Sequence, residues 1–219
     1  MKAARVKTLD IGADGIAWRH YDSTQADTLA QVPPAPGELY VWLVSTDFPF
    51  ASALNIGQWL TIAERRRARM HPRSPIGRRF SIARATLRLS LSHMLDCAPE
   101  EVGLTEGPFE RVAVSSHDVQ LGVDVAYAGI WIAIVIAACD VGVGLTVAPV
   151  SDDASRGGRA WAEAAGIARS RLGQASAAMA HDHALTLPMP GGFRGVALTR
   201  EPITRVSTFG FSRTVMLEG

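Results

Sequence analysis

The sequence contains few cysteines, a modest share of charges and no long apolar run, and each shortage excludes a class of protein. Cys97 and Cys139 are the two cysteines among 219 residues, too few for a disulfide framework, so we expect a reduced, cytoplasmic location. The N-terminal segment lacks the apolar stretch of a secretory signal. The longest uncharged run, residues 125–139, is shorter than the ~20 residues that cross a bilayer, and it contains Gly129. This run therefore predicts two buried strands and a turn, and we expect no membrane partner.

The charges of the chain nearly cancel. Lysine and arginine number 22 and aspartate and glutamate 21, for a net charge of +1. No overall field therefore draws the protein toward nucleic acid, and we expect no nucleic-acid partner. Apolar residues make up 47% of the chain, enough for a sizeable core in one or two domains.

The pattern of apolar and polar segments predicts an α+β fold with one or two antiparallel sheets. In chain order, we expect a polar, proline-rich arm or linker at 1–37, a strand at 39–44, helices at 52–70 and 78–95, strands between 112 and 148, a helix at 161–180, and short strands after it.

Five motifs occur in one order along residues 38–215. They are VWLVSTDFP with ERRRARM and GRRFSIARATLRLSLSHML, then GPFERV (107–112), VDVAYAGIW (123–131), VGVGLTV (141–147) and WAEAAGIAR (161–169). Their order and spacing resemble 4′-phosphopantetheinyl transferases of the actinobacterial type. The resemblance implies two similar α+β halves, 38–120 and 121–219, related by pseudo-two-fold symmetry and meeting at a cleft, with 1–37 as the arm.

The chain departs from this family at the positions that carry its chemistry. The family's magnesium-binding acids correspond here to Gly144, Thr146 and Ala165, and a threonine hydroxyl cannot replace carboxylates as a magnesium ligand. The family's phosphate-contacting histidine corresponds to Tyr127, and a lysine corresponds to Arg169. We therefore expect no bound metal, no cofactor and no transfer of phosphopantetheine.

The substitutions predict a more apolar cleft than the family has, and an apolar concavity with a few polar groups is typical of a small-molecule site. We expect Tyr127 to contact a substrate carbonyl, Arg169 to stabilise a developing enolate, and Glu163 or Asp124 to act as acid or base. The expected lining of this cleft is Trp131, Gly144, Thr146 and Trp161. The alternative interpretation is that an unused cleft has filled with core residues.

Arginines on the two N-terminal helices predict a second feature. The resemblance places Arg65, Arg79, Arg84 and Arg88 in the region that holds the coenzyme's phosphates. A guanidinium suits phosphate because its planar fork binds two oxygens. A residual site for a nucleotide or a carrier arm is one interpretation, and a solvated helix face is the other.

Three functions follow, in order of preference. The first is a metal-free biosynthetic enzyme, a cyclase or isomerase acting on an apolar, polyketide-type substrate. The second is a non-catalytic module that binds an acyl carrier protein or its pantetheine arm. The third is an active phosphopantetheinyl transferase with an unconventional metal site.

Overall fold

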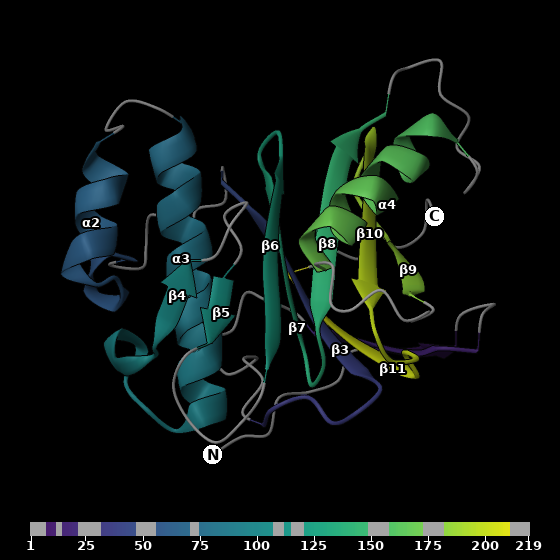
Figure 1. Cartoon of the computed structure of the whole chain (residues 1–219), viewed down its shortest axis with the longest axis horizontal. Helices are drawn as coiled ribbons and strands as arrows, with labels where there is room; N and C mark the ends of the chain where they lie inside the picture. The colour runs from purple at the N-terminus through teal and green to yellow at the C-terminus, as the bar shows by residue number, and fades with distance from the viewer. Residues whose placement is uncertain are drawn as a thin grey trace.

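The chain has an α+β fold with two main sheets (Figure 1). The computed structural model describes residues 8–11, 15–21, 32–46, 56–70, 75–106, 112–114, 121–148, 158–172 and 182–210. The strands are β1 (Thr8–Ile11), β2 (Ala17–Tyr21), β3 (Glu38–Ser45), β4 (Leu104–Glu106), β5 (Val112–Val114), β6 (Gly122–Ala128), β7 (Trp131–Ala137), β8 (Val141–Val147), β9 (His183–Leu187), β10 (Phe193–Thr199) and β11 (Arg205–Phe209). The helices are α2 (Ile62–Arg69), α3 (Pro75–Leu95) and α4 (Arg159–Leu172), with 3₁₀ turns η2 (Ile56–Trp59) and η3 (Pro99–Glu101).

The first sheet has six strands in the order β1-β2-β11-β3-β7-β6, and the second has three in the order β8-β10-β9. Strands β4 and β5 form a separate pair. Strand β11 runs parallel to both of its neighbours, and the other pairings are antiparallel. None of the described helices is long and apolar enough to cross a membrane.

Two strands lie within the N-terminal segment that was expected to be an arm or linker. Strands β1 and β2 fall within residues 1–37, and β2 lies beside β11 in the six-stranded sheet. The side chain of Trp18 packs against the core shared by the two sheets. All five side chains of β2 are half-buried, so β2 has no alternation of buried and exposed positions. The sequence therefore shows no pattern that predicts this strand.

The same order of elements occurs twice along the chain. The first unit is β3-α3-β6-β7, with α2 inserted before α3 and the β4–β5 pair inserted before β6, and the second is β8-α4-β9-β10. The last strand of each unit lies between the other two: β7 lies between β3 and β6, and β10 lies between β8 and β9. Strands β6 and β7, which follow the expected boundary between residues 120 and 121, belong to the same sheet as β3, because β6 pairs with β7 and β7 pairs with β3. The first unit continues to Ala137.

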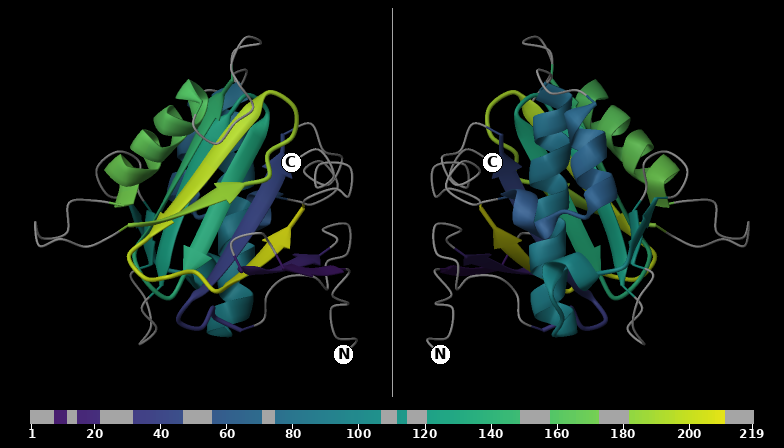
Figure 2. Two further views of the ribbon diagram at one scale, coloured as in Figure 1. Left: turned by 90° about the vertical axis from the view of Figure 1, so that its right-hand side faces the viewer. Right: turned by 90° about the vertical axis from the view of Figure 1, so that its left-hand side faces the viewer.

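Alternation along β6 and β7 gives the first sheet two different faces, since successive side chains of a strand point to opposite sides. One face carries the large side chains Val123, Val125, Tyr127, Ile132, Ile134 and Ile136 and packs against α3. The other face carries the smaller Ala126, Ala128, Ala133, Val135 and Ala137 and packs against the second sheet. Figures 1 and 2 show α2 and α3 together on one side of the molecule and α4 over the second sheet.

The helices differ from their predicted bounds at the ends. Of the expected helix at 52–70, residues 52–55 lie outside the described residues and 56–59 form the η2 turn. Helix α2 begins at Ile62, because Thr61 and Glu64 form a capping box there. Helix α3 begins at Pro75, a residue well tolerated in a first turn. Residues 107–111, most of the GPFERV motif, lie outside the described residues, as do 173–181 at the end of the third predicted helix.

Candidate functional site

A pocket of about 450 Å³ opens between helices α2 and α3 and the end of strand β6. Its lining combines arginines with apolar side chains and a tyrosine, among them Arg67, Arg79, Arg84, Met70, Ile76, Phe80 and Tyr127. The charged side chains among the described lining residues are all arginines. Cations beside apolar surface suit an organic anion, because guanidinium groups bind anionic oxygens while the apolar walls cover carbon.

Two of these arginines lie over the ring of Phe80. The guanidinium carbon of Arg67 is 4.7 Å from the ring centroid and that of Arg84 is 5.4 Å away. Such contacts hold a cation against the negative face of the ring. Arg84 is only 5% exposed, so its charge is held in a partly desolvated place, where electrostatic attraction is stronger than in bulk water.

The third arginine is tied to the turn that joins β6 to β7. Arg79 Nη1 donates a hydrogen bond to the carbonyl of Gly129, at 3.0 Å. Gly129 has a φ of +55°, which a glycine adopts without strain in a two-residue hairpin turn. The turn thus brings the start of α3 and the end of β6 together, where Tyr127 also lines the pocket.

The predicted cleft around Tyr127, Trp131, Thr146 and Trp161 is not formed by these side chains. Tyr127 packs on the α3 side of the first sheet, whereas Trp131 packs on the opposite face. Trp161 lies against the cluster of α4 and β10, with the guanidinium of Arg194 5.7 Å from its ring. The hairpin between Tyr127 and Trp131 sends the two rings to opposite faces despite their closeness in sequence.

Gly144 and Thr146 face helix α4 at close range rather than an open cleft. A Cβ atom added at Gly144 would lie 2.0 Å from the carbonyl oxygen of Ala164. The hydroxyl of Thr146 donates a hydrogen bond to the carbonyl of Ala160, at 3.0 Å. Backbone atoms of α4 therefore occupy the space in which ligand contacts were expected.

The remaining residues expected to be catalytic also lie away from the pocket. The carboxylate of Asp124 is buried, pairs with Arg171 at 3.0 Å and accepts the Val143 amide at 2.8 Å. Burial raises the pKa of Asp124, and this effect outweighs Arg171 and the backbone amides, which lower it. Arg169 is 64% exposed and pairs with Asp182, and Glu163 is exposed on α4. Of the four expected catalytic side chains, only Tyr127 lines the pocket.

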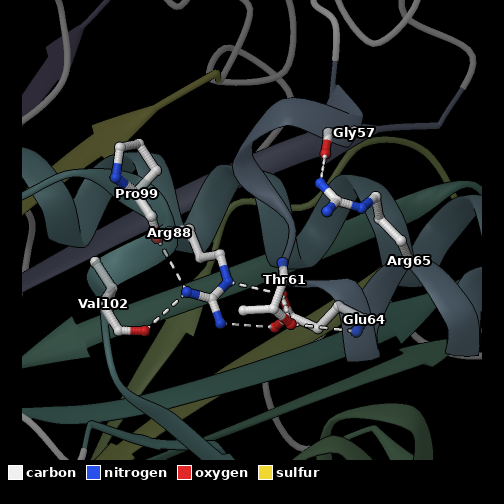
Figure 3. Close-up of polar contacts among 7 residues, drawn as sticks. All are labelled: Gly57, Thr61, Glu64, Arg65, Arg88, Pro99 and Val102. Atoms are coloured by element: carbon white, nitrogen blue, oxygen red, sulfur yellow. Dashed lines mark hydrogen bonds and ion pairs between the residues drawn. The ribbon is translucent and has the colours of Figure 1, made fainter.

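The four arginines predicted to bind phosphate divide into two groups. Arg79 and Arg84 line the pocket. Arg65 donates to the carbonyl of Gly57 at 2.9 Å, and Arg88 is buried against Glu64, so both brace the helices instead (Figure 3). Sequence reasoning missed Arg67, although the arginine-rich run ERRRARM that contains it was noted.

Sequence reasoning also missed Phe80. Its partners come from different helices, Arg67 from α2 and Arg84 from α3. Arg84 lies four residues after Phe80 on α3, so helical spacing predicts that contact, but no spacing predicts the contact with Arg67, which depends on how the two helices pack together.

Among the described residues, no group of three or more histidine, cysteine, aspartate or glutamate side chains is placed to hold a metal ion. No protein-family model matches the chain, and no curated protein matches it.

Proposed function

We propose that the chain is a binding module whose pocket takes an organic anion, namely the phosphopantetheine arm of an acyl carrier protein. The observation that carries this proposal is the convergence of Arg67, Arg79 and Arg84 with apolar walls in one pocket. The arginines suit the phosphate, and the apolar side chains suit the extended arm. The identity of the arm comes from the resemblance of the motifs to phosphopantetheinyl transferases.

This proposal replaces the metal-free enzyme as the preferred function. The enzyme hypothesis required Tyr127, Arg169 and Glu163 around a neutral, apolar cleft. The pocket is cationic instead, and Arg169 and Glu163 point to solvent on α4. The contacts of the pocket therefore favour binding of an anion over turnover of an apolar substrate.

We further propose a phosphopantetheinyl transferase-like fold with two units related by pseudo-two-fold symmetry. The repeated β-α-β-β order, with the same arrangement of strands in both sheets, supports this relation.

Titration calorimetry with 4′-phosphopantetheine tests the function. We expect wild-type protein to bind it, and pantetheine without the phosphate to bind at least ~10-fold more weakly, since a charge-assisted hydrogen bond contributes ~1.5–3 kcal/mol. Arg79→Gln is expected to weaken phosphopantetheine binding by a similar factor. Arg169→Gln is the matched control on α4 and should leave affinity unchanged.

Two results would count against the proposal. One is equal affinity for pantetheine and phosphopantetheine, or binding of neither. The other is a mass increase of one phosphopantetheine on an apo carrier protein incubated with this protein, coenzyme A and magnesium, which would favour the active transferase.

A further inference from the structure

Helix α2 forms one wall of the pocket but is not held by an apolar face. It has no buried side chain, and the apolar residues at its two ends, Ile62 and Met70, are each 71% exposed. Helix α3, in contrast, buries many side chains in the core. Most helices in proteins are held by packing of an apolar stripe. The attachment of α2 must therefore depend on polar contacts.

The carboxylate of Glu64 is the centre of these contacts (Figure 3). It accepts hydrogen bonds from the backbone N–H of Thr61 at 2.9 Å and from Arg88 Nε at 2.7 Å and Nη2 at 3.2 Å. The same side chain thus closes the capping box that begins α2 and receives a bidentate contact from α3.

Arg88 extends the connection to the chain that follows α3. It is 3% exposed, and its Nη1 donates to the carbonyls of Pro99 at 2.9 Å and Val102 at 2.7 Å. One buried guanidinium therefore joins α2, α3 and the η3 turn. A buried charge with its hydrogen bonds satisfied fixes geometry strongly, because any displacement leaves a desolvated charge without its partner.

We infer that the Glu64–Arg88 pair is a positioning device for the pocket: it holds α2 against α3 so that Arg67 and Met70 form the pocket wall. Arg67 follows Glu64 by one helical turn, so a shift of α2 moves the Arg67 guanidinium away from Phe80 and the pocket. Neither Glu64 nor Arg88 belongs to the lining, and both act through α2. The consequence for ligand affinity rests on the proposed function, whereas the attachment of α2 does not.

The test compares two buried ion pairs by removing the arginine of each. Arg88→Met breaks the Glu64 pair, and Arg171→Met breaks the Asp124 pair, which joins α4 to the first sheet. Amide hydrogen exchange of residues 61–70 and calorimetric titration with 4′-phosphopantetheine are measured on both full-length variants. Arg88→Met is expected to raise α2 exchange by ~10-fold or more and to weaken binding by a similar factor. Arg171→Met is expected to lower thermal stability by a comparable amount but to change neither the exchange of α2 nor the affinity for 4′-phosphopantetheine.

Two outcomes overturn the inference: α2 exchange that rises no more in Arg88→Met than in Arg171→Met, or a loosened α2 with unchanged affinity. If wild-type protein binds no phosphopantetheine, the proposed function fails and α2 exchange alone decides whether the pair holds the helix. Should Arg88→Met not fold, Glu64→Gln serves in its place. This substitution keeps the size of the side chain and an oxygen that accepts from the Thr61 amide, but it removes the charge opposite Arg88. We expect it to raise α2 exchange and to weaken binding, both by less than Arg88→Met does.

Discussion

At the scale of single residues, the glycines of β8 decide how closely α4 approaches the second sheet. A Cβ at Gly142 would lie 2.2 Å from the carbonyl oxygen of Ala168, and one at Gly144 would lie 2.0 Å from that of Ala164. Real side chains do not tolerate such distances, so the helix backbone rests directly on the strand. The buried alanines of α4 face these glycines and complete a contact made of small residues.

Gly144→Ala is therefore expected to destabilise the protein. The added methyl group meets helix backbone rather than a flexible side chain, so α4 must shift, and overpacking of this kind costs ~1–3 kcal/mol. Gly166→Ala, on exposed α4 surface with no atom near the new methyl group, should stabilise by ~0.5–1 kcal/mol because alanine favours helix. Urea denaturation measures both. Equal stability of Gly144→Ala and wild type would show that α4 does not rest on β8 in this way.

At the scale of elements, α2 depends on an ionised Glu64. Burial raises the pKa of Glu64, but the hydrogen bonds from Arg88 and the Thr61 amide and the charges of Arg88 and Arg84 outweigh burial, so the pKa falls below its ordinary 4.5. A depressed carboxyl pKa means that folding favours the charged form. The stabilisation is then complete above pH 4.5 and is lost as pH falls through the lower pKa of the folded protein.

Glu64→Gln should consequently lower the free energy of unfolding by ~1.5–3 kcal/mol at neutral pH. We expect this difference from wild type to stay constant between neutral pH and about pH 5, and to shrink below pH 4.5 as Glu64 of the wild type becomes protonated. Glu163→Gln, an exposed glutamate on α4, is the control and should match wild type throughout. Chemical denaturation across this pH series provides the measurement, and a difference that persists undiminished at low pH would contradict the role of the charge.

At the scale of the whole molecule, the two sheets share one core. Side chains of β3, β6 and β7 pack against those of β8, β9 and β10 in a single cluster. Asp124 on β6 adds a polar link, because it accepts the amide of Val143 on β8 and pairs with Arg171 on α4. Neither sheet can lose its partner without exposing this core.

The protein is accordingly expected to unfold in one cooperative step despite its two units. Far-ultraviolet circular dichroism reports mainly on the sheets and helices, and tryptophan fluorescence reports on both units, since Trp42 lies on β3 and Trp161 on α4. The two signals should change together in urea. Transitions with separate midpoints would mean that the units are independent domains.

The sequence alone determined the α+β class and the positions of several elements. Helix α3 and strands β6 to β8 follow from local periodicity and from punctuation by proline and glycine, which act over a few residues. The resemblance also singled out Tyr127, Arg79 and Arg84, which line the pocket, and their roles there stay predictions.

Only the tertiary structure decided which of the candidate residues meet. Trp131 was expected beside Tyr127, but the hairpin places it on the other face, and Gly144 and Thr146 are covered by α4. These outcomes depend on which face of a strand a helix covers and how closely it approaches. Contacts between distant segments set both, and no local pattern records them. The contact of Arg67 on α2 with Phe80 on α3 therefore could not be predicted from either helix alone.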